Sequence, residues 1–125
     1  MTIPERLAAD VAKLTAAGFT IEVLEEGSRY YVVFRNFDSS HFNPAVVDRL
    51  MVMADYQYNQ SKIDMFYTSP TVFLPSGQLP RNADQFEEHC GLKWQRWSYH
   101  YTWDPTKHDL TTHIEVVRQR LVAGE

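Results

Sequence analysis

Apolar residues recur at helical spacing only near the two ends of the chain, first at Leu7, Val11 and Leu14 and later at Leu110, Ile114, Val117 and Leu121. Between these ends the chain shows patterns typical of strands, and no helical pattern separates one from the next. Parallel strands would need a long crossover between them, usually a helix, so this order favours antiparallel pairing. The sequence therefore predicts an α+β fold, an antiparallel meander with both helices packed on one side.

Four segments between the helices are predicted to be strands: residues 19–23, 30–37, 46–54 and 63–67. They are rich in β-branched and aromatic residues, which suit a pleated, half-buried surface. Stretches rich in Gly, Pro, Asn, Asp and Ser separate them, as expected for turns. Residues 81–93 are polar and have no clear period, so they are predicted to be mostly loop, with room for a turn of helix.

Both helices carry a capping signal near their start. The first is Thr2-Ile3-Pro4-Glu5, in which a threonine precedes a glutamate by three residues and a proline falls in the first turn. The second is Thr106, three residues before Asp109. These signals predict that the two helices begin near Thr2 and Thr106.

The composition is that of one globular domain spanning residues 1–125. The formal net charge of −4 argues against nucleic acid as the main partner, because phosphate binding needs a basic surface. The single cysteine, Cys90, excludes an internal disulfide and suits a reducing compartment. No apolar run approaches membrane-spanning length, and no signal-peptide pattern opens the chain. The sequence therefore predicts a cytoplasmic protein that binds neither membrane nor nucleic acid.

The segment from Trp94 to Trp103 concentrates aromatic residues between the polar stretch and the closing helix. Within it, Ser98 and His100 are two residues apart, a spacing that places both side chains on one face of an extended chain. A hydroxyl beside an imidazole provides the nucleophile and the general base that acyl transfer needs, because the imidazole can take the hydroxyl proton. The alternative is that the aromatics form a core and that Ser98 and His100 are its polar neighbours. The residues alone favour this alternative, because aromatic side chains are mainly burial residues.

Several short motifs along the chain carry a resemblance to a known family. They are Tyr30-Tyr31-Val32-Val33-Phe34-Arg35-Asn36-Phe37, Phe42-Asn43-Pro44, Asp64-Met65-Phe66-Tyr67 with Pro70, the turn at Gly77 and Leu79-Pro80, Trp94-Gln95-Arg96-Trp97-Ser98-Tyr99-His100, Trp103, and Asp109-Leu110. With the order of elements, these motifs resemble the bacterial members called prokaryotic family E of the ubiquitin-conjugating superfamily. The resemblance implies an N-terminal helix, a four-stranded antiparallel meander, an active-site loop and a C-terminal helix.

The resemblance also implies a function and partners. Such a protein would accept a ubiquitin-like modifier from an activating enzyme as a covalent ester and pass it to a target amine, in a bacterial conjugation pathway. The His-Pro-Asn triplet of eukaryotic relatives is absent, and no cysteine stands between Trp94 and Trp103, where their nucleophile would be expected. The resemblance therefore implies an oxyester on Ser98, with His100 as the base.

Two other readings stay open. Cys90 would carry the modifier as a thioester if positive charge from His89 and Lys93 lowered the pKa of its thiol. Alternatively, the protein would be a non-catalytic adaptor that binds the modifier or the activating enzyme through exposed aromatic side chains. An adaptor would keep its function without Ser98, which separates the two classes.

Supporting roles can be suggested for other residues of the same region. Gln95 or Asn82 would donate hydrogen bonds to the oxyanion of an acyl-transfer step. Trp103 would frame the site loop, and Arg96 would contact the modifier's tail or the loop itself.

Four acidic and imidazole side chains lie close together in the sequence and are candidate metal ligands, namely Asp104, His108, Asp109 and His113. They lack the spacing of a recognisable ligand set, and a capping aspartate with a surface histidine explains them. The sequence predicts neither a metal nor a cofactor.

Overall fold

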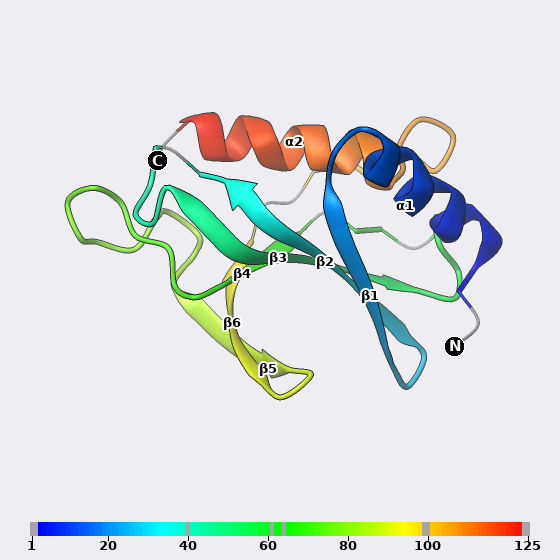
Figure 1. Cartoon of the computed structure of the whole chain (residues 1–125), viewed down its shortest axis with the longest axis horizontal. Coiled ribbons are helices and arrows are strands. Elements are labelled where there is room, and N and C mark those ends of the chain that lie inside the picture. The colour runs from blue at the N-terminus through cyan, green and yellow to red at the C-terminus, as the bar shows by residue number, and fades with distance from the viewer. Residues whose placement is uncertain (1–2, 40, 61, 64, 99–100, 124–125) are drawn as a thin grey trace.

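The computed structural model describes residues 3–39, 41–60, 62–63, 65–98 and 101–123. The elements are helix α1 (Glu5–Ala16), strands β1 (Thr20–Glu26), β2 (Arg29–Asp38), β3 (Val46–Asp55), β4 (Phe66–Ser69), β5 (Gln85–His89) and β6 (Leu92–Trp97), and helix α2 (Leu110–Ala123). The strands form one sheet in the order β1-β2-β3-β4-β6-β5, and each neighbouring pair is antiparallel. Both helices lie on the same side of this sheet (Figure 1). The predicted α+β fold is confirmed.

The sheet has six strands in the part of the chain that the structure describes, so the predicted count of four is wrong. The additional strands, β5 and β6, form a hairpin over residues predicted to be loop and aromatic segment. Cys90 and Gly91 make its turn, and both have a positive φ (53° and 76°), as a tight two-residue hairpin turn requires. Gln85, Phe86 and Glu88 are exposed on the edge strand β5. An edge strand of this kind has no apolar alternation from which it could be predicted.

Strand β4 is displaced from its predicted position. The predicted segment, residues 63–67, overlaps it only at Phe66 and Tyr67, and the strand continues to Ser69. Ile63 is buried in the core although it precedes the strand. The apolar pattern therefore begins before the hydrogen-bonded strand does.

Apolar side chains pack on both faces of the sheet. On one face, alternate residues of β2 and β3, such as Phe34 and Leu50, pack with apolar residues of both helices in the main core. On the opposite face, the intervening residues form a second cluster, here called the far-face cluster: Tyr31, Val33, Met51, Tyr67 and Trp94. Strand β6 contributes Trp97 to the main core and Trp94 to the far-face cluster. The sheet thus lies between the main core on the helix side and the smaller far-face cluster.

Helix α1 begins at Glu5, directly after a proline whose fixed φ suits that position. Thr2, the predicted capping residue, lies outside the described residues. Leu7 and Leu14 are buried and Val11 packs against the main core, which confirms the predicted apolar stripe. Within the described ranges, neither helix has the length and apolar character needed to cross a membrane.

Helix α2 begins at Leu110, after a reciprocal cap built by Asp109 and Thr112. The Asp109 carboxylate accepts from the Thr112 backbone N–H at 3.0 Å, and the Thr112 hydroxyl oxygen accepts from the Asp109 N–H at 2.9 Å. The prediction of a cap at Thr106 is wrong. The backbone N–H and the hydroxyl of Thr106 instead donate to the carboxylate of Asp104 in the preceding turn.

Candidate functional site

Residues 98–109 connect β6 to α2 and are called here the β6–α2 segment. Ser98 opens the segment where the chain leaves the sheet, and it is partly exposed. Its backbone N–H donates to the carbonyl of Asn82 at 2.9 Å. His100 lies outside the described residues, so its pairing with Ser98 stays a prediction. The structure thus describes how Ser98 is held but not its predicted base.

Gln95 holds the loop that carries Asn82. Its buried amide nitrogen donates to the carbonyls of Ala83 at 2.9 Å and Val72 at 3.0 Å. Its amide oxygen accepts from the Val72 N–H at 2.7 Å and from the Thr68 hydroxyl at 3.0 Å. These four bonds use the full capacity of the carboxamide. Because both amide protons are engaged inside the protein, the structure contradicts the predicted role of Gln95 as an oxyanion donor and makes it a support for the Ser98 region.

A tyrosine and a histidine anchor the β6–α2 segment just beyond His100. The Tyr101 hydroxyl lies 2.7 Å from Nδ1 of His113, and Nε2 of His113 lies 2.9 Å from the carbonyl oxygen of Met65. His113 is 1% exposed. A carbonyl oxygen can only accept, so Nε2 carries a ring proton and donates it to the Met65 carbonyl, while Nδ1 shares a hydrogen bond with the Tyr101 hydroxyl. The pair therefore ties the segment to both α2 and the approach to β4.

Trp103 provides a further anchor. Its indole N–H donates to the backbone carbonyl of Asn59 at 2.8 Å. The side-chain amide of Asn59 donates in return to the carbonyls of Pro105, at 3.1 Å, and His108. The Asp104 N–H closes the turn by donating to Nδ1 of His108 at 2.9 Å. Trp103 thus frames the segment by joining it to the turn at residues 56–60.

The four candidate metal ligands have other contacts. Asp104 accepts from Thr106, Asp109 caps α2, His108 accepts from the Asp104 N–H, and His113 shares a hydrogen bond with Tyr101. Among the residues that the structure describes, no group of three or more His, Cys, Asp or Glu side chains is arranged to hold a metal ion.

Cys90 lies on the opposite side of the sheet, in the hairpin turn beside the far-face cluster. Burial raises the pKa of its thiol, and the neighbouring Glu26 carboxylate raises it further. His89 bonds to Glu87 at 2.8 Å, and the Lys93 ammonium lies over an aromatic ring. The prediction that His89 and Lys93 lower the thiol pKa is therefore wrong, which weakens the case for a thioester.

This environment predicts that the Cys90 thiol reacts slowly with alkylating agents. At neutral pH, iodoacetamide should alkylate Cys90 of the folded protein several-fold more slowly than it alkylates free glutathione, because less thiolate is present. Glu26→Gln should speed the reaction by removing a negative charge, whereas Glu22→Gln, at an exposed position four residues earlier on the same strand, should not. The measurement is the alkylation rate by mass spectrometry. Equal rates for glutathione and Cys90 would contradict the prediction.

Arg96 belongs to the far face. Its guanidinium donates to the carboxylate of Glu87 at 2.9 Å, and the same carboxylate bonds to His89. Burial and the nearby Glu87 raise the pKa of Tyr67 to about 12 in this cluster. The predicted contact of Arg96 with a modifier's tail stays a prediction.

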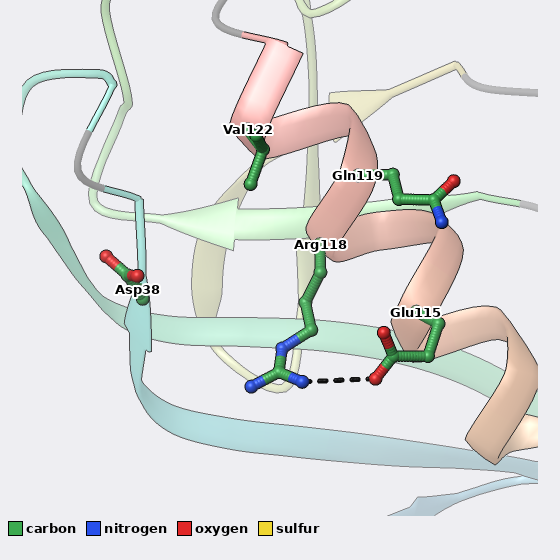
Figure 2. A pocket seen from close by; sticks show the side chains of 5 residues that line it. All are labelled: Asp38, Glu115, Arg118, Gln119 and Val122. Atoms are coloured by element: carbon green, nitrogen blue, oxygen red, sulfur yellow. Dashed lines mark hydrogen bonds and ion pairs between the residues drawn. The ribbon is translucent and has the colours of Figure 1, made fainter.

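A surface cavity of about 460 Å³ lies between the outer side of α2 and the end of β2. Figure 2 shows the side chains that line it: Asp38, Glu115, Arg118, Gln119 and Val122. Arg118 pairs with Glu115, three residues earlier on α2, at 3.1 Å. The lining residues lie outside the β6–α2 segment, so this cavity is distinct from the candidate site.

Two residues that shape the site were missed as such from sequence patterns. His113 lies on the buried stripe of α2, three residues after Leu110, and a histidine on an apolar helical face signals a buried hydrogen-bonding group. Asn59 gives no comparable signal, because the bonds that it makes to the segment span 44 to 49 positions of sequence.

Comparison with known proteins gives one family match. The chain matches the family model described as Prokaryotic E2 family E over residues 6–123. Neither the curated proteins nor the solved structures searched contain a match. The matched range includes α1 except its first residue, the six described strands, the β6–α2 segment and α2. The protein therefore belongs to prokaryotic E2 family E.

Proposed function

We propose that this protein is the carrier enzyme of a bacterial ubiquitin-like conjugation pathway. It receives the C-terminus of a ubiquitin-like modifier from an activating enzyme as an ester on Ser98 and transfers it to a target amine. Family membership supports a role in ubiquitin-like conjugation with partners of these classes. The observation that supports Ser98 as the nucleophile is its position in the fold. Ser98 opens a segment anchored to α2 and to the turn at residues 56–60, whereas Cys90 lies across the sheet with a raised pKa.

The loading step needs a nucleophile and a base. The Ser98 oxygen bonds to the C-terminal carbonyl carbon of the activated modifier while the bond from that carbon to the activating enzyme breaks. The serine proton passes to His100 and then to the departing group, so the step is balanced in atoms and charge. A positioned base of this kind is worth about 10²–10⁴-fold in rate.

The test is adduct formation with the activating enzyme, ATP and the modifier. We expect a covalent adduct on a denaturing gel that survives reducing agent, is cleaved by mild alkali, and is absent from Ser98→Ala. Cys90→Ser is the matched control, since it removes the alternative nucleophile, and it should form the same adduct. The melting temperature of each variant should stay within a few degrees of the wild type.

Each other outcome changes the assignment. An adduct released by reducing agent and lost in Cys90→Ser would move the chemistry to the thiol. The absence of any adduct, together with tight binding of the modifier or the activating enzyme, would make the protein a non-catalytic adaptor and overturn the proposal.

A further inference from the structure

Strand β5 leaves one edge of the sheet open, and one end of that edge lies beside Ser98. In the part of the chain that the structure describes, β5 pairs only with β6 (Figure 1). Gln85, the first residue of β5, lies opposite Arg96, and shortly before it the carbonyl of Asn82 accepts from the Ser98 N–H at 2.9 Å. From there β5 runs away from Ser98 toward the hairpin turn. The open edge therefore connects the turn with the surroundings of the proposed nucleophile.

The geometry of the hairpin determines which backbone groups of β5 face the open edge. Its two-residue turn makes His89 and Leu92 a hydrogen-bonded pair. In an antiparallel ladder such pairs alternate with pairs that have no hydrogen bonds between them. The N–H and C=O groups of Phe86 and Glu88 therefore point away from β6, and the described residues give them no other backbone partner. These groups are open to an added strand.

The side chains along this edge favour a basic partner. Asp84 and Glu88 are exposed on either side of Phe86, and among the described residues neither carboxylate has a hydrogen bond or an ion pair. The nearby Lys93 ammonium lies over the Phe86 ring, 4.6 Å from its centroid. A hollow of about 160 Å³ lies against the edge, lined by Phe86, Glu87, Glu88 and Lys93. An extended segment with basic and apolar side chains fits this edge, whereas a second copy of β5 would place acidic side chains near one another.

We propose that β5 binds the extended C-terminal tail of the ubiquitin-like modifier as an added antiparallel strand. The inference rests on the proposed function, because it describes how the modifier's C-terminus reaches Ser98. The direction of the tail follows from the end that it must reach. A tail whose last residue meets Ser98 runs from the hairpin turn toward Gln85, which is opposite to β5 and continues the antiparallel order of the sheet.

Strand spacing gives the length of tail that this arrangement needs. Neighbouring strands lie about 4.8 Å apart, so a tail on the open edge of β5 lies about 10 Å from β6. An extended chain covers about 3.3 Å per residue, so about three residues beyond the paired stretch span that distance. They pass the exposed turn at Arg81 and Asn82. The tail therefore consists of about three paired residues, including a basic one, and about three residues that lead to the nucleophile.

Pairing is tested in Ser98→Ala, which keeps β5 and lacks the proposed nucleophile, so that binding is measured without loading. Amide hydrogen exchange is followed by NMR with the full-length modifier of the loading assay, and with the same modifier lacking about six C-terminal residues. When about nine-tenths of the protein is bound, the Phe86 and Glu88 amides should exchange about 10-fold more slowly, because exchange proceeds from the free fraction. The truncated modifier should leave both amides unchanged.

Variants of Glu88 test whether pairing serves loading. Glu88→Pro removes an outward N–H and a negative charge but no bond between β5 and β6, and an edge strand tolerates proline at such a position. It should need about 10-fold more loaded activating enzyme for half-maximal loading, with the maximal rate unchanged. Glu88→Lys keeps the backbone N–H, reverses the charge, and should shift the concentration in the same direction.

Glu25→Pro is the matched control for Glu88→Pro. Glu25 is an exposed glutamate of β1, the opposite edge strand, and lies opposite Tyr30, one pair before a two-residue turn, as Glu88 lies opposite Lys93. This variant should load as the wild type does. Melting temperatures of the variants identify any loss of fold.

The outcomes separate this inference from the proposed function. Normal loading of the wild type without protection of the Phe86 and Glu88 amides overturns the inference alone, as do folded Glu88→Pro and Glu88→Lys proteins that load at wild-type concentrations. Protection that persists with the truncated modifier, or that appears without modifier at high protein concentration, assigns the edge to another surface or to a second copy and also overturns it. A wild-type protein that never loads overturns the proposed function, whereas tail-dependent protection of β5 would still support tail binding.

Discussion

Replacing Gln95 with leucine is expected to lower the free energy of unfolding by about 3–5 kcal/mol. The change removes hydrogen bonds from the N–H and carbonyl of Val72 and from the carbonyl of Ala83, all in buried surroundings. Each buried backbone group left without a partner costs about 1–3 kcal/mol, and the apolar side chain of leucine offsets only part of the sum. A loss of this size is a large fraction of the stability of a typical domain, about 5–15 kcal/mol.

The measurement is urea unfolding followed by circular dichroism. Gln119→Leu, at an exposed position of α2, makes the same chemical change without buried partners and should stay within about 0.5 kcal/mol of the wild type. A loss below about 1 kcal/mol for Gln95→Leu would show that water or a rearranged loop replaces the lost bonds. The same variant should also weaken the hold on Ser98, because Gln95 binds the carbonyl of the residue after Asn82.

Tyr58→Phe is expected to lower the free energy of unfolding by about 3 kcal/mol at neutral pH. The Tyr58 hydroxyl donates to the carboxylate of Asp10 in α1, and its oxygen accepts from the N–H of Leu110 at the start of α2. Asp10 is 3% exposed, so its carboxylate would lose a donor where water has little access. Tyr56→Phe, at a 66% exposed position of the same turn, is the matched control and should have little effect.

The same variant should change the dependence of stability on alkaline pH. Burial, together with the Asp10 carboxylate, raises the pKa of Tyr58 above its ordinary value of 10.0. Because the folded-state pKa is the higher one, its stabilising contribution is complete below pH 10 and is lost as the pH rises and the unfolded chain gives up its proton first. The free energy of unfolding should fall less steeply above pH 10 in Tyr58→Phe than in the wild type. Parallel curves for the two proteins would contradict the role given to Tyr58. The pKa of Tyr67 is also raised, and this residue contributes equally to the curves of the wild type and of Tyr58→Phe.

Residue patterns predicted those parts of the fold in which burial repeats regularly along the chain. The apolar stripes of α1 and α2 and the alternation of β1 belong to this class, whereas β2 and β3 were predicted from their content of β-branched, aromatic and other apolar residues, which pack on both faces of the sheet. The β5–β6 hairpin does not, because β5 is an exposed edge strand and its turn depends on Cys90 adopting a positive φ. The predicted cap of α2, Thr106, lies three residues before the observed cap, Asp109. Thr106 hydrogen-bonds to the carboxylate of Asp104 instead of the first turn of α2.

The candidate site was less predictable than the fold. Ser98 was found from its spacing to His100 and from family resemblance, and neither depends on distant contacts. The bonds that hold the site join residues far apart in sequence, such as Trp103 with Asn59 and His113 with Met65. Local periodicity carries no information about such pairs. Gln95 illustrates the consequence, because an amide in the motif suggested chemistry whereas its contacts are structural.

The three tryptophans lie in different parts of the molecule, so the fluorescence of each can report on its own region. Trp97 is stacked on Phe66 in the main core, Trp94 lies in the far-face cluster, and Trp103 bonds the β6–α2 segment to Asn59. Three variants that each keep one indole would report fluorescence from the helix side, the hairpin side and the candidate site separately. Binding of a modifier or an activating enzyme could then be localised on the molecule without attaching any dye.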